Sequence, residues 1–216
     1  MPRIYAGLDL TGSARPSGYA VLDPRATLLD AGLVGADDEI AALLERTRAT
    51  VVAIDAPLGL PEGLCCLEAS CPCASARSPG IRESEIAVRS LGYGLYHTTK
   101  RTIIRAMVYR GIALRRRLEA RGLRVREVYP YATKVALFGR PIPKKTTRAG
   151  VRWLRERAEA LVPGVAAIRR DLTHDELDAI IAAYTALLLD RGEAVALGNE
   201  AEGTIVVPRA RASISG

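Results

Sequence analysis

The chain has 216 residues, 49% of them hydrophobic, which is long and apolar enough for one domain with a core and excludes a disordered tail or a coiled coil. Lys and Arg number 31 against 24 Asp and Glu, a net charge of +7 carried mostly by arginine. This suits phosphate binding, although an arginine-rich composition explains it equally well. The longest apolar run, 179–189, is too short to cross a membrane and no apolar leader follows Met1, so we expect a cytoplasmic protein without a membrane partner.

Hydrophobic periodicity predicts strands and helices in an α/β order. The predicted strands cover 3–10, 19–22, 27–34, 51–55, 124–129 and 204–207, and the predicted helices cover 98–121, part of 143–161 and 173–192, with a further helix opening at Asp37. Short connections favour antiparallel pairing of the first three strands, and the helix before the fourth strand allows it to lie parallel to the first. We expect a single domain over 1–216, with an insertion at about 57–122 that is irregular and cysteine-containing at first and then basic and helical.

Two of these strands end in an acid. Asp9 closes the first predicted strand and Asp55 closes the fourth. If the strands are parallel neighbours, both carboxylates emerge at the same edge of the sheet, where α/β proteins bind their ligands. Two carboxylates held together repel each other unless a proton or a cation lies between them. Each acid alone could instead cap a turn.

The predicted helix over 173–192 begins with more acids. A capping box accounts for Glu176, and the helix dipole accommodates Asp175 in the first turn. Asp178 lies beyond that turn, among neighbours that are mostly small or apolar. Because a buried carboxylate is costly unless it is paired or binds a metal, we expect Asp178 to share a cation with the two strand acids. An ion pair with an arginine is the alternative interpretation.

An acid on the first strand, an acid on the fourth and Asp-x-x-Asp at the start of the closing helix form a recognisable order. This order resembles that of RNase H-like nucleases, and most closely that of Holliday-junction resolvases of the RuvC type. The resemblance implies that Asp9 is the central metal ligand, Asp55 the second and Asp178 the third, with Asp175 beside them. The fourth-strand acid of that family is usually Glu, where this chain has Asp.

Further segments cover nearly the whole chain: AIDAPLGLP, IRESEIAVRSLG, REVYPYATKVALFG, KKTTRAGVRWL, HDELDAIIAA and EGTIVVP. Together they resemble the signatures of an uncharacterised family described as predicted RNase H-like nucleases. The resemblance implies an RNase H-like mixed sheet, three antiparallel strands followed by parallel ones, flanked by helices. Within these segments we expect Glu127 to add a carboxylate to the site, or else to pair with an arginine at the surface. Arg82, Lys144 and Lys145 are expected to contact nucleic acid.

The stretch 97–126 is strongly basic, with ten Lys or Arg and one acid. Arg115, Arg116 and Arg117 cover nearly a full helical turn and are expected to contact the phosphate backbone, with an affinity that falls as salt rises. A solvated helix face in an arginine-rich protein is the alternative. Because aromatic residues are few and Phe138 is the only Phe, we do not expect a platform that stacks single-stranded bases.

All four cysteines fall in the nine residues CCLEASCPC, at positions 65, 66, 71 and 73. The spacing is not the paired C-x-x-C of strong zinc motifs, and adjacent cysteines rarely bind one tetrahedral ion together. One or two disulfides, a zinc site and free thiols are all open. Catalysis by cysteine is not expected, since neither His97 nor His174 has the context of a triad.

These patterns predict a nuclease that hydrolyses phosphodiester bonds of nucleic acid with Mg²⁺ or Mn²⁺. The expected catalytic residues are Asp9, Asp55, Asp175, Asp178 and Glu127, and the metal ligands among them are Asp9, Asp55 and Asp178. One alternative is a non-catalytic nucleic-acid-binding module of the same fold. Another is an ATP-handling protein of the actin and sugar-kinase superfamily, because GLDLTGS resembles the first phosphate-binding turn of these proteins. Nucleic acid is the expected partner, and a homodimer is also compatible with the sequence.

Overall fold

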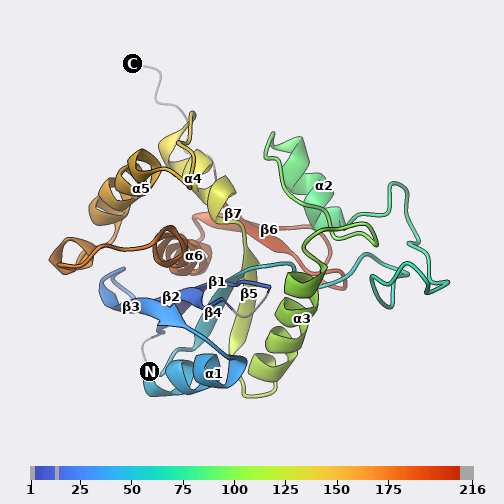
Figure 1. The fold of residues 1–216 in the computed structure, drawn as a ribbon, viewed down its shortest axis with the longest axis horizontal. Coiled ribbons are helices and arrows are strands. Elements are labelled where there is room, and N and C mark those ends of the chain that lie inside the picture. Colours follow the sequence, from blue (N-terminus) through green and yellow to red (C-terminus); the bar gives the residue numbers. More distant parts are fainter. Residues whose placement is uncertain (1–2, 13–14, 210–216) are drawn as a thin grey trace.

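A seven-stranded sheet runs through the centre of the protein, as the computed structural model in Figure 1 shows. The structure describes residues 3–12 and 15–209; Ser13 of the GLDLTGS turn lies outside them. The strand order is β3-β2-β1-β4-β5-β7-β6. The strands are β1 (Tyr5–Asp9), β2 (Ser17–Leu22), β3 (Leu28–Val34), β4 (Val51–Asp55), β5 (Arg124–Val128), β6 (Ala194–Leu197) and β7 (Ile205–Pro208).

The pairing of the strands confirms the predicted arrangement. β1 pairs with β2 and β2 with β3 in antiparallel fashion, and β4 lies beside β1 and parallel to it. β5 continues the parallel set beside β4, and β7 follows β5. β6 closes the far edge antiparallel to β7. The fold class is therefore mixed α/β, with three antiparallel strands followed by parallel ones, as expected.

Helices cover both faces of the sheet (Figure 1). They are α1 (Asp37–Arg46), α2 (Glu83–Ser90), α3 (Arg105–Glu119), α4 (Pro130–Phe138), α5 (Arg148–Leu161) and α6 (His174–Asp190), with a short 3₁₀ turn at Val165–Ala167. α1 and α3 pack on one face, and α6 packs on the other with α4 and α5 outside it. Within the described residues, none of these helices has the length and apolarity needed to traverse a bilayer.

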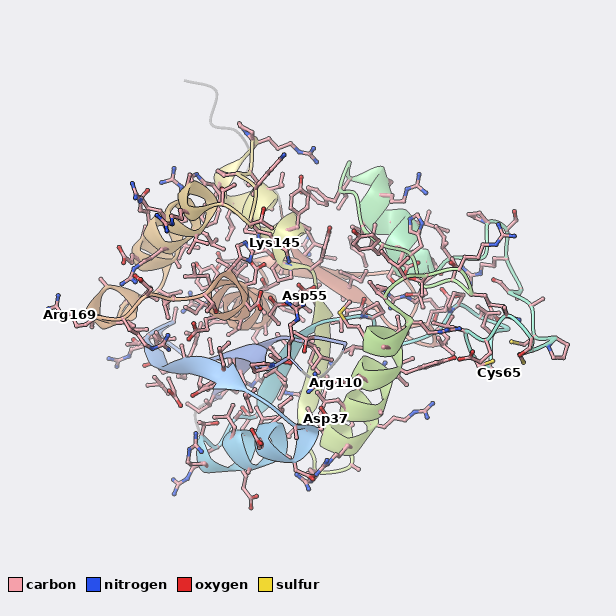
Figure 2. All side chains as sticks on the ribbon, in the orientation of Figure 1. Asp37, Asp55, Cys65, Arg110, Lys145 and Arg169 are labelled. Carbon is pink, nitrogen blue, oxygen red and sulfur yellow. The ribbon has the colours of Figure 1, made fainter. Side chains whose placement is uncertain are left out.

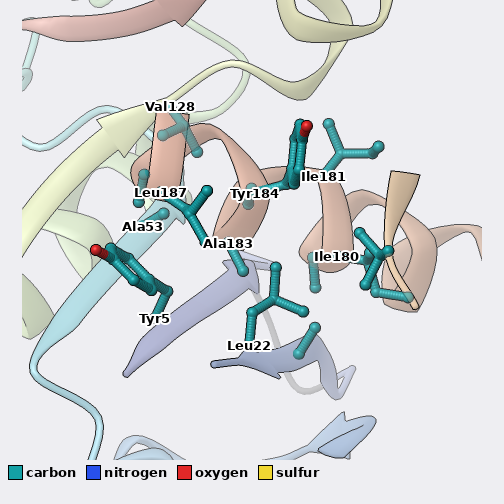
Figure 3. Packing of buried hydrophobic residues seen from close by; sticks show 14 of the residues in the cluster. Tyr5, Leu22, Ala53, Val128, Ile180, Ile181, Ala183, Tyr184 and Leu187 are labelled. Atoms are coloured by element: carbon teal, nitrogen blue, oxygen red, sulfur yellow. The ribbon is translucent and has the colours of Figure 1, made fainter. Parts of the chain in front are cut away.

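The helix α6 is buried on nearly every side, because the sheet lies on one flank and α4 and α5 lie on the others. Figure 3 shows Ile180, Ala183 and Leu187 of α6 among the core side chains. Its sequence is accordingly apolar all round rather than along one stripe. On β1, Tyr5 and Gly7 face α6, whereas Leu8 faces the layer of α1 and α3. This alternation points Asp9, two residues after Gly7, toward α6.

Several elements differ from the expectation. The helix expected over 98–121 begins only at Arg105, because the residues before it form turns in which the Thr99 hydroxyl accepts from the Arg101 amide and competes with helical bonding. The helices α2 and α4 and the strand β6 were not expected. For α4 the reason is local: Pro130 stands at its first position, where a proline starts a helix as readily as it stops a strand.

Candidate active site

The carboxylates of Asp9 and Asp55 close two neighbouring parallel strands. They are direct partners in the register of β1 and β4, so their side chains leave the sheet side by side. Both stand on the face covered by α6, since Gly7 on β1 and Ala53 on β4 pack against that helix. The structure thus brings together the two strand acids that the sequence placed at one edge.

Two glycines determine how closely α6 approaches these strands. A Cβ atom at Gly7 would lie 2.0 Å from the backbone oxygen of Ala179, and one at Gly18 would lie 2.2 Å from that of Asp175. Both distances are far inside van der Waals contact, so only glycine allows the backbone of α6 to rest on β1 and β2. This contact holds the first turns of α6, with Asp175 and Asp178, against the ends of the strands.

The carboxylate of Asp178 is buried, and a cation already contacts it. The ammonium of Lys134 donates a 2.7 Å hydrogen bond to Asp178 Oδ1, and both side chains are 6% exposed. His174 Nδ1, one turn earlier on α6, lies 3.1 Å from Asp178 Oδ2. Asp178 is therefore paired, but with a lysine from α4 rather than with an arginine. Sequence reasoning missed the roles of Lys134 and His174. The available signal for Lys134 was that it is a single charged residue in the apolar stretch after Pro130.

The protonation of the three acids reflects this arrangement. Burial, followed by the charges of Asp55, Asp178 and Asp175, raises the pKa of Asp9 to about 9. Burial and the charge of Asp178 raise the pKa of Asp55 to about 7, against the lowering effect of Lys134 and Lys145. Burial also acts to raise the pKa of Asp178, but the adjacent Lys134 and His174 outweigh it and hold that pKa below its ordinary value. The site thus keeps a proton on Asp9 near neutral pH.

The donor set fits a divalent cation of the magnesium class. It offers carboxylate oxygens only, and the crowding of negative charge that raises the pKa of Asp9 and Asp55 is relieved when a cation replaces the protons. In the described part of the chain, no three acids have carboxylate oxygens that all lie within 4.8 Å of one another, whereas the sulfur atoms of the four cysteines do. In this structure, the cation that contacts Asp178 is the ammonium of Lys134. A metal ion bound to Asp178 would have to displace this ammonium or share the carboxylate with it.

A cleft of about 560 Å³ opens over these acids. Five acids line it: Asp9, Asp55, Glu127, Asp175 and Asp178. Its other walls carry Lys134, Lys144, Lys145 and Arg15, together with the tyrosines 96, 129 and 131. Figure 2 labels Asp55 and Lys145, both near the middle of the molecule.

The tyrosines come from segments far apart in the sequence. Tyr96 is 65% exposed, and the rings of Tyr129 and Tyr131 lie 5.9 Å apart and tilted. All three line the same cleft as the acids. The expectation that the chain lacks an aromatic platform rested on their scarcity along the sequence, and the fold gathers them.

Glu127 also lines the cleft, but its carboxylate is paired with an arginine. In the register of β5 it stands beside Ile54, on the face that packs toward α3, opposite to the face of Asp55. Arg82 clamps it with two 2.7 Å hydrogen bonds, and the Leu58 amide donates to it as well. Arg82 is 1% exposed, lines the cleft and also bonds Glu85, so in this structure its guanidinium is occupied by two carboxylates, and its contact with nucleic acid stays a prediction.

The remaining basic residues divide into two groups. Lys144 and Lys145 are exposed and line the cleft. The consecutive arginines Arg115, Arg116 and Arg117 of α3 do not line it: Arg115 pairs with Glu119, Arg117 pairs with Asp38, and Arg116 is exposed. Of the residues expected to contact nucleic acid, Arg82, Lys144 and Lys145 line the cleft, and the two lysines are the exposed ones among these three.

Comparisons with known proteins show a family and two similar solved structures. The model of a family described as "Protein of unknown function (DUF429)" matches residues 7–203. Among solved structures, T. thermophilus RuvC in complex with a Holliday junction substrate is 13% identical with a TM-score of 0.48, and the alignment covers 88% of this chain and 96% of that one. A second Thermus thermophilus RuvC structure is 14% identical with a TM-score of 0.45 and the same coverage. No curated protein shows significant similarity to the chain.

Proposed function

The chain belongs to the DUF429 family, whose function is unknown, and we propose that it is a divalent-metal-dependent nuclease that cleaves phosphodiester bonds of nucleic acid. The observation that carries the proposal is the cleft in which Asp9 and Asp55, register partners on parallel strands, meet Asp175 and Asp178 from α6. Like-charge crowding at this position has no structural use, since acids that only supported the fold would each have a cationic partner.

Each acid has a distinct part in this proposal. Asp9, Asp55 and Asp178 hold the Mg²⁺ or Mn²⁺, with Asp175 beside them. The bound metal supplies an activated water and stabilises the leaving oxygen. In the metal-free protein the ammonium of Lys134 offsets the charge of Asp178, which lessens the repulsion between Asp178 and the other acids. His174 steadies the second oxygen of Asp178 from the same helix.

The other walls of the cleft favour nucleic acid as the substrate. Lys144 and Lys145 place two ammonium groups beside the acids, where they attract a phosphate and orient its charge. Tyr96, Tyr129 and Tyr131 line the cleft, and aromatic side chains are the groups on which unpaired bases stack. We therefore include a preference for unpaired nucleotides over a regular duplex in the proposal.

The test is a cleavage assay on labelled single-stranded DNA, single-stranded RNA, duplex and four-way junction, with Mg²⁺, Mn²⁺ or a chelator. We expect cleavage that needs the metal and is strongest on unpaired nucleotides. Asp55→Asn should remove it, whereas the exposed Asp171→Asn, purified in the same way, should not. Equal cleavage by both variants would reveal a contaminating nuclease and end the proposal.

Two other outcomes favour the other candidate functions. Salt-sensitive binding of nucleic acid without cleavage under either metal identifies a non-catalytic binding module. A shift of the melting temperature on adding ATP, with no response to nucleic acid, identifies an ATP-handling protein.

The tyrosines have their own control: Tyr96→Phe keeps the ring and should keep the preference for single strands, and Tyr96→Ala should weaken binding by about 1–3 kcal/mol.

A further inference from the structure

The four cysteines lie in the irregular segment between β4 and α2, far from the acids. Figure 2 shows Cys65 at the outer edge of the molecule, away from Asp55. We propose that Cys65, Cys66, Cys71 and Cys73 bind one Zn²⁺ ion as a structural site that is independent of the nuclease site.

The positions of the sulfur atoms carry the proposal. One Sγ from each cysteine lies within 4.8 Å of the other three, and the Sγ atoms of Cys65 and Cys71 are 3.5 Å apart. Tetrahedral zinc with Zn–S bonds of about 2.3 Å separates its ligand sulfurs by roughly 3.8 Å. A disulfide requires a separation of about 2.05 Å, and it joins sulfurs in pairs. Convergence of all four on one point is the arrangement that a single ion requires.

Contacts between the loop and α3 explain how four cysteines with this unusual sequence spacing come together. Leu67 is fully buried, and its amide donates a 2.7 Å hydrogen bond to the Tyr109 hydroxyl on α3. Glu68 pairs with Arg105 at 3.0 Å, and the Lys100 ammonium donates to the Cys71 carbonyl. These contacts hold the loop between the two pairs of cysteines against α3. The fold therefore turns Cys65 and Cys66 back toward Cys71 and Cys73. This convergence was not expected from the sequence, because Cys65 and Cys66 are adjacent.

The surroundings suit an ion that is acquired from solution. Cys65 is exposed and the other three cysteines are partly exposed, so zinc can reach the thiols. Lys100 brings a positive charge to the loop and offsets part of the negative charge of four thiolates around Zn²⁺. Binding exchanges the thiol protons for the metal, and no electron transfer is involved. The loop has little hydrophobic core of its own, so a metal cross-link would stabilise it.

The first experiment titrates Co²⁺ into the reduced, chelator-treated full-length protein. We expect a thiolate-to-cobalt charge-transfer absorption that saturates at one equivalent per chain and disappears on adding Zn²⁺, together with a rise in melting temperature with Zn²⁺. Asp9→Asn should leave the absorption unchanged, because carboxylates produce no thiolate band. Cys71→Ser and Cys73→Ser should each weaken or remove it.

A second measurement covers the case in which a serine variant fails to fold. Zinc should protect all four thiols of the wild-type protein from alkylation, and a chelator should restore their reactivity. Recovery of fewer than four thiols from unreduced, denatured protein would show disulfides instead. Alkylation at the same rate with and without Zn²⁺, or a titration without a thiolate band, would overturn the zinc site. Neither result bears on the nuclease proposal, which rests on other residues.

Discussion

Replacing Asp9 with Asn should change how the stability of the metal-free protein depends on pH. Asp9 has a pKa of about 9 in the folded protein against an ordinary value of 3.8 in an unfolded chain. Between these values the folded state holds a proton that the unfolded state has released, so the free energy of unfolding falls as pH rises. One such proton corresponds to a slope of about 1.4 kcal/mol per pH unit. Asp9→Asn cannot titrate and should lack this contribution.

The structure fixes the pH window in which the effect is clearest. Asp55 adds a similar contribution up to its own pKa of about 7, whereas above that value Asp9 alone of the pair still holds its proton. From about pH 7 to 9 the wild-type protein should lose up to about 2–3 kcal/mol relative to Asp9→Asn. The other titrating groups, including the cysteines and histidines, are present in both proteins and cancel in the difference.

Urea unfolding at a series of pH values in chelator measures the difference, with Asp171→Asn as a control for the loss of one exposed acid. Asp171→Asn should follow the wild-type slope. Adding Mn²⁺ at 100 times its dissociation constant should then stabilise the wild type by about 2.7 kcal/mol and leave Asp9→Asn nearly unchanged. Identical pH slopes for the wild type and Asp9→Asn would refute the reasoning, because they would mean that burial and the neighbouring charges do not raise the pKa of Asp9.

The remaining predictions concern the supports of the site. Lys134→Met should destabilise the metal-free protein by about 3–5 kcal/mol in urea unfolding, since it leaves the carboxylate of Asp178 buried without its cation; a neutral result would mean that Asp178 takes up a proton at little cost. Gly7→Ala should lower both the melting temperature and the metal-dependent cleavage, because its Cβ displaces α6 from β1; a fully active, stable variant contradicts the tight contact. Lys145→Ala should reduce the salt dependence of nucleic-acid affinity by a slope of roughly 1, and Arg116→Ala should not, as measured by binding at several salt concentrations; the reverse order would move the interface to α3.

The acids could be located from sequence because each follows from a short-range rule. Alternation along 3–10 placed Asp9 on a definite face, and the apolar run before Asp55 identified a central parallel strand. The parallel register then brought the two together, as the structure shows. Asp178 was identified because its position, one turn inside an apolar helix, demanded a partner.

The partner itself could not be identified in this way. Lys134 reaches Asp178 only because α4 forms after β5 and packs on α6, and no helix was expected in this part of the sequence. The pairing of Arg82 with Glu127 is likewise a long-range contact between an irregular segment and a strand. Such contacts depend on which segments meet in space, and periodicity carries no information on that.

Arg82 and Glu127 also bear on whether the segment between β4 and α3 is a removable appendage. In Figure 1 this segment extends outward as if it were a separate module. Its polar anchors nevertheless reach into the body of the protein: Arg82 neutralises Glu127 on β5, and Glu202, 2% exposed, accepts hydrogen bonds from the amides of Glu62 and Glu83. Excising the segment would remove the hydrogen-bond partners of both carboxylates and uncover the apolar surface beside them, so it would destabilise the protein. A shortened chain that joined β4 directly to α3 would therefore not be a minimal domain but an unstable fragment.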